Sequence, residues 1–204
     1  MIIPYHIYPE KRYFCEKLTD MKRSYLFLAT GFEEIEALAT VDVLRRAGMQ
    51  VTIVSIYKER QVTGANGITA VADEVLAGVD LAEADWLIFP GGMPGAENLY
   101  RDSTLMDALR RHAARGGRIA AICAAPAVVL AQAGVLEGRD ATCYPGFEPL
   151  MKQHGAKPVG GRVVIDGNII TGNGPSSALP FAYAIAAATV GKEAAQQVSD
   201  GMLY

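Results

Sequence analysis

Residues 118–133 have the sequence Arg118-Ile-Ala-Ala-Ile-Cys-Ala-Ala-Pro-Ala-Val-Val-Leu-Ala-Gln-Ala133. The apolar run 118–122 has the length of a buried strand, and the segment 125–133, which stops before a glycine, has the composition of a helix. Cys123 lies between them. Pro126 suits a first helical turn, because its missing N–H would have no partner there. The stretch predicts a strand, a tight turn that carries a thiol, and a helix, as in the nucleophile elbow of serine hydrolases.

The rest of the chain repeats this alternation of strand and helix. In order, we predict strand 24–29, helix 33–47, strand 50–56, hairpin 61–72, strand 85–90, helix 103–115, strand 118–122, helix 125–133, strand 141–143, helix 147–153, hairpin 161–171, helix 177–190 and a shorter helix from Lys192. Such alternation is typical of βαβ units. The expected fold is therefore α/β: a three-layer sandwich with a mostly parallel, flavodoxin-like sheet and helices on both faces.

The first twenty residues show neither a helical nor a strand period. Met21 opens a short basic stretch that leads into the first predicted strand, and it is a candidate initiator. Residues 1–20 are then an N-terminal extension, either a mobile tail or an upstream translation artefact. Residues 21–204 are expected to form a single domain, the default for a chain of this length.

Composition disfavours several classes of protein. The formal net charge of −3 gives no basic excess that would attract nucleic acid. No apolar run is long enough to span a membrane and no secretion signal is evident, so we expect a cytoplasmic protein. Its three cysteines, Cys15, Cys123 and Cys143, are too few for a disulfide framework, and no CxxC or HxxxH pattern suggests a metal.

The Cys123 thiol is the leading candidate for chemistry. Unpaired N–H groups at the start of a helix favour a thiolate, which predicts a nucleophile or a redox-active cysteine; the alternative is a buried core cysteine. Cys143 is either a resolving thiol or, more often, inert. No histidine is an evident base: His6 lies in the extension, His112 on a predicted solvent face, and His154 near a helix end.

Ligands of open α/β sheets bind at the carboxyl ends of the strands, so the loops there are of interest. Thr30 and Glu33 have the spacing of a capping box, and Glu34 can serve the helix dipole. Glu36 falls toward the apolar side of helix 33–47. It is either a buried carboxyl that keeps its proton and acts as a donor or proton shuttle for the thiol, or a surface glutamate at the edge of the apolar stripe.

Three further loops follow predicted strands. The glycines of Gly91-Gly-Met-Pro-Gly95 allow close backbone approach and could aim N–H groups at an oxyanion, although a plain tight turn is the alternative. The spacing does not match a phosphate loop. Residues 141–145 and 171–177 could line the same pocket.

Five segments, taken in order, resemble the ThiJ/PfpI superfamily, which has the class I glutamine amidotransferase-like fold. Within it the chain is similar to the branch that contains the Parkinsonism-associated deglycase-like protein. The resemblance extends from Lys22 to the C-terminal helices, and its segments are 31–37, 41–48, 89–96, 121–126 and 173–175.

The resemblance implies roles for particular residues. Cys123 is then the reactive cysteine, and Glu36 the protonated glutamate that hydrogen-bonds it and stabilises its sulfinate. The amides of Gly91 and Gly92 contribute an oxyanion site. The resemblance also implies a homodimer.

Three positions depart from the family pattern and lie near the expected pocket. Proteolytic members carry His directly after the cysteine, where this chain has Ala124, so protease activity is disfavoured. Tyr144 stands where the deglycase-like branch often has His, and Asn173 where it often has Arg. We therefore expect Tyr144 and Asn173 to bear on substrate preference and catalytic competence. Together with Ala124 they are candidate oxyanion or substrate-binding residues.

Together these features predict a cysteine-dependent enzyme that needs no cofactor. Its expected substrates are small α-oxoaldehydes, such as methylglyoxal, or their early glycation adducts on amino groups, and its products 2-hydroxy acids. The chemistry would be glyoxalase III-like or deglycase-like. The alternative is an oxidative-stress redox sensor or chaperone-like protective protein, in which Cys123 is oxidised and turnover is small.

Overall fold

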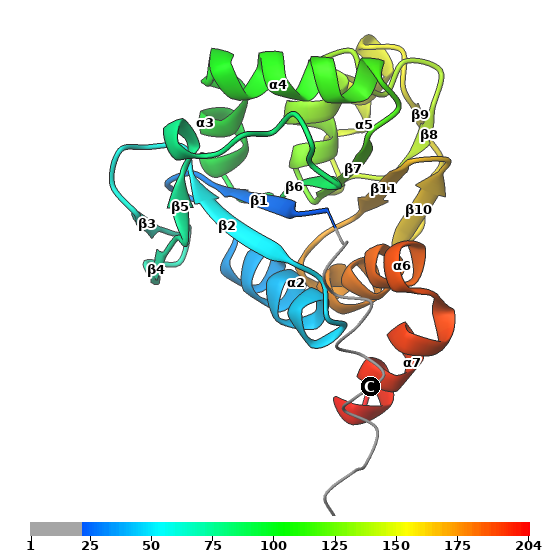
Figure 1. Ribbon diagram of the computed structural model, residues 1–204. Helices are drawn as coiled ribbons and strands as arrows, with labels where there is room; N and C mark the ends of the chain where they lie inside the picture. Colours follow the sequence, from blue (N-terminus) through cyan, green and yellow to red (C-terminus); the bar gives the residue numbers. More distant parts are fainter. Residues whose placement is uncertain (1–21) are drawn as a thin grey trace, which may run out of the picture.

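The central element of the computed structural model, which describes residues 22–204, is a seven-stranded sheet in the order β10-β11-β7-β6-β1-β2-β5 (Figure 1). Every neighbouring pair is parallel except β10 and β11. The strands are β1 (Ser24–Leu28), β2 (Val51–Ser55), β5 (Glu74–Val75), β6 (Trp86–Phe89), β7 (Arg118–Ile122), β10 (Val163–Asp166) and β11 (Ile169–Gly172). The predicted N-terminal extension, with Met21, His6 and Cys15, lies outside the described residues.

The order β2-β1-β6-β7-β11 is the predicted flavodoxin-like arrangement. These strands are buried on both faces, which explains why their sequences are continuous apolar runs and do not alternate. The chain reverses its direction of strand addition between β1 and β6. At such a switch point the loops leaving two neighbouring strands diverge, so a site is expected at the carboxyl ends of β1, β6 and β7.

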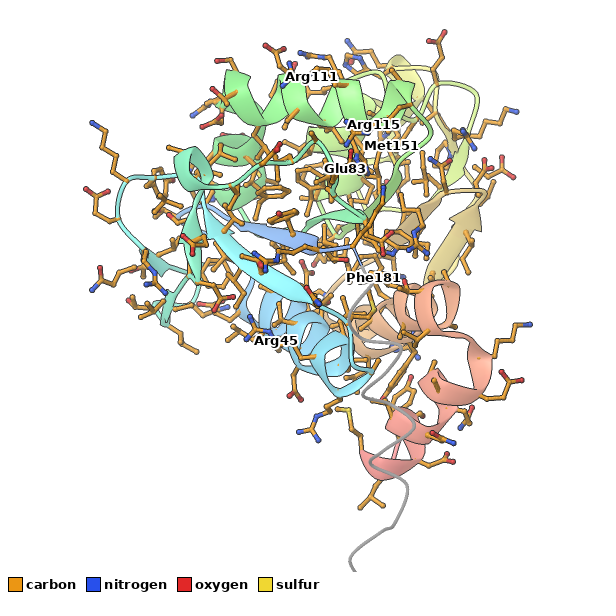
Figure 2. The ribbon with its side chains drawn as sticks, viewed as in Figure 1. Arg45, Glu83, Arg111, Arg115, Met151 and Phe181 are labelled. Atoms are coloured by element: carbon orange, nitrogen blue, oxygen red, sulfur yellow. The ribbon has the colours of Figure 1, made fainter. Side chains whose placement is uncertain are left out.

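Helices cover both faces of the sheet (Figure 1). One layer holds α2 (Glu34–Arg46) and α6 (Ala178–Val190), with α7 (Lys192–Gly201) packed on α6. The other holds α3 (Gly95–Arg101), α4 (Ser103–Ala114) and α5 (Glu148–Gln153). Phe181 of α6 and Met151 of α5 are fully buried in these two layers (Figure 2). The three-layer prediction is confirmed.

Several short elements differ from the sequence-based expectation. The segment after Cys123 is a π-helix, η3 (Pro126–Ala131), and not an α-helix. The strand expected at 141–143 is β8 (Asp140–Ala141), which pairs with β9 (Lys157–Pro158) outside the central sheet. The hairpin expected at 61–72 is present as β3 (Gln61–Thr63) and β4 (Thr69–Val71). The helix α3, the strands β5 and β9, and the 3-10 turns η2 (Leu76–Gly78) and η4 (Pro175–Ser177) were not predicted.

Two local predictions were wrong. Thr30 does not cap α2; the cap is Glu33, whose carboxylate accepts a hydrogen bond of 2.7 Å from the N–H of Glu36. His112 does not face solvent: it is 1% exposed. Its ring packs over Gly117, where an added Cβ would lie 2.3 Å from Nε2. The glycine makes the space that the imidazole fills.

Within residues 22–204, none of the helices has both the length and the apolar content needed to cross a membrane.

Candidate active site

Cys123 occupies the turn directly after β7. Its φ of 66° is in the left-handed region, which costs free energy for a residue with a Cβ and is found mostly where the surroundings enforce it. Two hydrogen bonds do so here. The N–H of Cys123 donates to the carbonyl of Gly172 (2.9 Å), and its carbonyl accepts from the N–H of Tyr144 (2.8 Å). The predicted strand, tight turn and helical segment are therefore present. Backbone hydrogen bonds to Gly172 and Tyr144 fix the conformation of the turn.

Glu36 lies in the first turn of α2 and is fully buried, with 0% of its surface exposed. Helical periodicity allowed either a buried carboxyl or a surface glutamate at this position, and the structure shows the buried carboxyl. Its Oε2 accepts a hydrogen bond of 2.8 Å from the N–H of Gly91. Within the described residues, Oε1 is buried without a partner of ordinary hydrogen-bond geometry. The carboxyl does interact with the Cys123 thiol, and each affects the pKa of the other.

Gly91 permits this meeting of thiol and carboxyl. An added Cβ would lie 2.6 Å from Cβ of Cys123, 2.8 Å from Oε2 of Glu36 and 2.9 Å from the carbonyl oxygen of Ile122. No side chain fits there without moving one of the two reactive groups. The structure thus gives Gly91 a different task from the one expected, because its N–H is engaged by Glu36.

Two other backbone amides face the sulfur. Hydrogen bonds from the N–H groups of Gly92 and Ala124 act to lower the pKa of Cys123. The same donors would stabilise negative charge on sulfur or on an oxygen bound beside it. Gly92 and Ala124 are two of the residues expected near an oxyanion, and their N–H groups lie within hydrogen-bond reach of the Cys123 sulfur.

Burial dominates the electrostatics of the pair. It raises the pKa of Glu36 to about 7, against the opposing hydrogen bonds from Cys123 and Gly91. Burial, followed by the charge and hydrogen bond of Glu36, raises the pKa of Cys123 to about 12. The expected low thiol pKa is not found, because the carboxylate and the apolar surroundings outweigh the N–H groups of the turn. The two groups therefore share one proton over the range between these values.

Glu34 is the first residue of α2, and besides the predicted interaction with the helix dipole it makes contacts with a distant turn. It is buried, and its carboxylate accepts hydrogen bonds from the N–H and Nδ2 of Asn66 (2.7 and 2.9 Å) and from the N–H of Ile68 (3.3 Å). Although burial opposes it, these donors hold the pKa of Glu34 below its usual range. The carboxylate thereby fixes the turn between β3 and β4 against the first turn of α2. The sequence offered no signal for this contact.

The remaining predicted residues surround the elbow. The Tyr144 side chain is exposed, while its ring edge lies near Gly174. Oδ1 of Asn173 accepts a hydrogen bond of 2.6 Å from the hydroxyl of Ser177, a partner that the sequence did not indicate. Cys143 is a buried free thiol whose pKa is raised to about 12 by burial and by the charge of Glu148. Its thiol is therefore protonated at neutral pH.

Taken together, the site contains a strained thiol, a buried carboxyl with a pKa near neutrality and two N–H donors. This set suits a reaction in which sulfur attacks a carbonyl carbon while the carboxyl accepts and returns protons. In the described part of the chain, no group of three or more His, Cys, Asp or Glu side chains is arranged to hold a metal ion.

Comparison with known proteins gives consistent matches. The model of the DJ-1/PfpI family matches residues 22–188. Protein dj-1beta of Drosophila melanogaster is 39% identical over 182 residues, which cover 89% of this chain and 97% of that protein. Caenorhabditis elegans has a protein named glutathione-independent glyoxalase DJR-1.2, which is 37% identical over 161 residues, covering 79% of this chain and 84% of that one.

Solved structures have the same fold. The structure of Toxoplasma gondii DJ-1 in an oxidized form superposes with a TM-score of 0.85 at 37% sequence identity, covering 90% of this chain and 98% of that chain. Drosophila melanogaster DJ-1beta also gives a TM-score of 0.85, at 39% identity and the same coverage.

Proposed function

Since the chain belongs to the DJ-1/PfpI family, we propose that it is a cysteine-dependent enzyme that converts α-oxoaldehydes, or their early adducts with amines, to 2-hydroxy acids without a cofactor. The observation that carries the proposal is the buried contact between Glu36 and Cys123 across Gly91, with the pKa of Glu36 raised to about 7. A carboxyl with that pKa can both take and release a proton at neutral pH. The glyoxalase name of the C. elegans relative supports the same chemistry.

The first step forms a carbon–sulfur bond. The sulfur of Cys123 adds to the aldehyde carbon of methylglyoxal while ionised Glu36 takes the thiol proton. This order suits a thiol whose pKa of about 12 leaves it protonated until substrate arrives. Negative charge develops on the aldehyde oxygen near the N–H groups of Gly92 and Ala124, and Glu36 then returns its proton to this oxygen, which becomes the hydroxyl of a hemithioacetal.

The second step is an internal redox reaction that needs no outside oxidant. Ionised Glu36 takes the proton from the former aldehyde carbon and delivers it to the neighbouring carbonyl carbon through an enediol, while the proton of the first hydroxyl passes to the second oxygen. The first carbon is thereby oxidised as the second is reduced. The product is a thioester of lactate on Cys123, which water hydrolyses to lactate and free thiol. For an amine adduct, the initial carbon–sulfur bond forms as the carbon–nitrogen bond breaks and the amine leaves with a proton.

The test is lactate formation from methylglyoxal by the unmodified chain, Cys123→Ser and Glu36→Gln. Both variants should lose activity, Glu36→Gln by about a hundredfold or more, as expected when a positioned acid–base group is removed. In the unmodified chain, kcat/KM should rise with pH as Glu36 ionises, with an apparent pKa near 7. Lactate formation that survives in Cys123→Ser would exclude this mechanism.

A redox role is the second candidate, favoured by the oxidized state of the solved T. gondii relative. Oxidation of Cys123 to a sulfinate would place charge where the N–H groups of Gly92 and Ala124 point. Mass spectrometry after graded peroxide treatment tests this proposal. The gain of two oxygens on Cys123 at low dose supports it, and indifference to peroxide contradicts it.

We further propose that the protein is a cytoplasmic homodimer. Ile35 and Leu38 expose apolar surface on α2, and Ile68 does so on the turn that Glu34 ties to the same helix. An exposed apolar surface of this kind is typical of an interface. Light scattering after size exclusion should give twice the mass of one chain, and Ile35→Glu should reduce it to a single chain.

A further inference from the structure

Glu33 links the carboxyl of Glu36 to the loop that holds it. It lies between β1 and α2 and is partly buried. Its carboxylate accepts a hydrogen bond of 2.7 Å from the N–H of Glu36, and its own N–H donates to the carbonyl of Gly91 at 3.0 Å. The N–H of Gly91 in turn donates to Oε2 of Glu36 at 2.8 Å. The three residues therefore form a closed ring of hydrogen bonds that includes the Glu36 carboxyl.

The loop that carries Glu33 packs directly on the backbone of Gly92. An added Cβ at Gly92 would lie 2.4 Å from the carbonyl oxygen of Gly31 and 2.5 Å from the nitrogen of Glu33. The N–H of Gly92 faces the sulfur of Cys123. Glu33 is thus held against the loop whose amides contact both Glu36 and the sulfur.

The charge of Glu33 acts on Glu36 at short range. Residues three positions apart at a helix surface have Cβ atoms about 5–6 Å apart. Burial is the main cause of the raised pKa of Glu36, hydrogen bonds from Cys123 and Gly91 oppose it, and the negative charge of Glu33 adds to the rise. A negative charge at this distance makes Glu36 hold its proton more firmly and, once ionised, accept a proton more readily.

The first turn of α2 supports the carboxylate form of Glu33. Burial raises the pKa of Glu33, the N–H groups of Glu36 and Ile35 oppose the rise, and the charge of Glu34 adds to it. Unpaired N–H groups at the start of a helix favour a negative charge. The helix thus provides the donors that keep this charge beside Glu36.

The elements packed around Glu36 bring few other titratable groups to it. Cys123 approaches from the turn after β7. The loop 90–95 and the segment η3 contain no titratable side chain, and the two charged side chains of α3 pair with each other. The helix α6, which packs along α2, has Tyr183, which interacts with α7 and with the later turns of α2. Among these described groups, Glu33 carries the charge that acts on Glu36.

We propose that Glu33 is a positioning residue for the reaction at Cys123. It fixes Glu36 through the first turn of α2 and through Gly91, and its negative charge makes Glu36 a stronger proton acceptor. The inference rests on the proposed function and assigns a task to a second carboxyl beside the thiol. Glu33 acts only through Glu36 and neither gives nor takes a proton in the reaction.

The titration of Glu36 can be measured without turnover. The side-chain carboxyl carbons of the full chain are followed by NMR from about pH 4 to about pH 9, and the signal of Glu36 is assigned by its loss in Glu36→Gln. Glu33→Gln can keep the acceptor oxygen but has no charge. In this variant the midpoint for Glu36 should move from about 7 toward acid by about half a pH unit or more. Half a unit is the effect of one charge about 6 Å away in water, and burial enlarges it.

A matched pair of variants separates the charge of Glu33 from its capping of α2. Asp and Asn have the same shape and are similarly good N-caps, so Glu33→Asp and Glu33→Asn differ mainly in charge. The midpoint for Glu36 should be lower in Glu33→Asn than in Glu33→Asp, and this comparison decides the question even if Glu33→Gln fails to fold. Glu193→Gln removes an exposed charge from α7 and should leave the midpoint unchanged.

Turnover gives a second readout. The profile of kcat/KM for methylglyoxal against pH should move toward acid in Glu33→Gln by the same amount as the carboxyl signal. Its limit at high pH should fall about twofold, because a weaker base accepts the thiol proton less readily. A purely structural role of Glu33 would lower kcat/KM at every pH without moving the midpoint.

Three outcomes would overturn the proposal: an unchanged midpoint for Glu36 in Glu33→Gln, equal midpoints in Glu33→Asp and Glu33→Asn, or an equal shift in Glu193→Gln. If the carboxyl signal shifts as expected but the unmodified chain does not convert methylglyoxal, the proposed function is contradicted, whereas the effect of Glu33 on Glu36 is supported. Lactate formation together with an unshifted Glu36 signal would leave the proposed function standing and remove the role of Glu33.

Discussion

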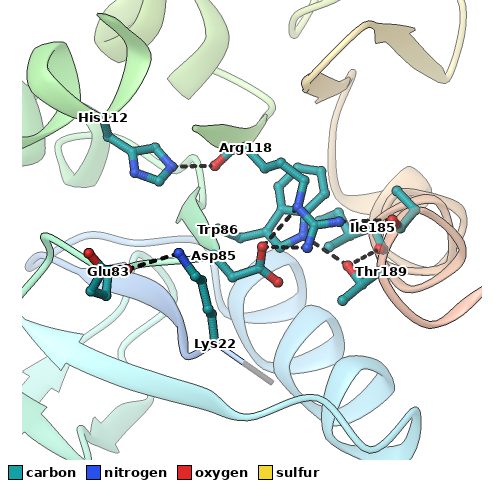
Figure 3. A network of polar contacts seen from close by, with 9 residues as sticks. Lys22, Glu83, Asp85, Trp86, His112, Arg118, Ile185 and Thr189 are labelled. Carbon is teal, nitrogen blue, oxygen red and sulfur yellow. Dashed lines mark hydrogen bonds and ion pairs between the residues drawn. The ribbon is translucent and has the colours of Figure 1, made fainter. Parts of the chain in front are cut away.

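At the amino ends of β6 and β7 the charged side chains of Lys22, Glu83, Asp85 and Arg118 form two ion pairs, whereas at the carboxyl ends the buried carboxyl of Glu36 has one oxygen without a hydrogen-bond partner among the described residues. Arg118 donates to Asp85 (2.9 Å from Nε) and to the carbonyl of Ala188 (2.8 Å), and lies 5.0 Å above the centre of the Trp86 ring (Figure 3). Lys22 pairs with Glu83 at 2.9 Å. At the other end, the carboxyl of Glu36 interacts with the thiol of Cys123, and its Oε1 has no partner of ordinary hydrogen-bond geometry within residues 22–204.

The difference separates ion pairs, which stabilise the fold, from the coupled carboxyl and thiol to which we assign the chemistry in our proposal. A paired charge keeps one protonation state over a wide pH range, while a buried and underpaired carboxyl changes its state near neutrality. The two ends should also respond to pH in opposite directions. Burial raises the pKa of Glu36 at the carboxyl end and lowers that of His112 at the amino end.

The largest expected effect comes from Glu36. Its pKa is raised from 4.5 unfolded to about 7 folded, so its contribution to stability is complete below pH 4.5 and is lost as pH rises through 7. The loss is about 3 kcal/mol in the free energy of unfolding. Glu36→Gln should remove this dependence and be more stable than the unmodified chain at pH 8. Denaturant titrations between pH 4.5 and 8 measure it.

Glu34→Gln is the informative control, because it changes the adjacent carboxyl, whose pKa is lowered. Glu34→Gln should lower the free energy of unfolding at neutral pH. The variant should still lose stability between pH 4.5 and 8, because Glu36 is unchanged. If both variants show the same pH dependence, the distinction between coupled and paired carboxyls in α2 is wrong.

At the paired end the largest effect is expected from Asp85. Its side chain is 16% exposed and that of Arg118 is 31% exposed, so the pair lies between exposed and buried ion pairs. Asp85→Ala leaves the guanidinium without its carboxylate and should cost about 2 kcal/mol. Asp107→Ala, which breaks an exposed pair with Arg110 on α4, should cost less than about 0.5 kcal/mol. Equal losses would mean that burial does not strengthen the Asp85 pair.

A smaller effect is expected from the indole of Trp86. Its Nε1–H donates to the hydroxyl of Thr189 at 2.9 Å, and the ring is 1% exposed. Thr189→Val keeps the shape but leaves this buried donor unpaired, which should cost about 1 kcal/mol. Thr189→Ser keeps the acceptor and should cost less. Thermal unfolding of the two variants tests whether the hydroxyl matters.

Much of this architecture was predictable because its signals are local. The runs at 24–29, 85–90 and 118–122 are long and apolar enough to specify buried strands, and all three are present. The burial of Glu36 was one of two alternatives that helical periodicity allowed. Periodicity gives the face of a helix on which a residue lies, but not the depth to which other elements cover that face.

The contacts made by distant segments were not predictable. The bond between Glu34 and Asn66 spans 32 residues, and the charge of Glu148 at Cys143 depends on how α5 packs against η3 and β9. The prediction of a low pKa for the Cys123 thiol was wrong for a related reason. The helical segment after Cys123 could be recognised in the sequence, whereas the carboxylate that interacts with the sulfur comes from another helix. No spacing within one segment contains that information.

The smallest expected effect on the pH dependence of stability comes from His112. The direction of its pKa shift depends on contacts that the sequence does not indicate. Arg115 donates to Nδ1 (3.0 Å), so Nε2 carries the proton and donates to the carbonyl of Arg118 (3.0 Å). A second proton on Nδ1 would face a guanidinium in a buried site. Burial, with the charge of Arg115, lowers the pKa of His112, although the Arg118 carbonyl and Asp85 oppose this.

A lowered imidazole pKa gives stability that is present above pH 6.5 and is lost as pH falls through the folded pKa. In the unmodified chain this loss is masked, because Glu36 makes the protein more stable as pH falls over the same range. In the Glu36→Gln background, unfolding at pH 7.5 and 5.5 should show an acid decline that is absent when His112→Gln is added, even if the double variant is less stable at both values. If the acid decline persists in the variant that carries both Glu36→Gln and His112→Gln, the titrating group is not His112. The two ends of the sheet would then not respond to pH in opposite directions.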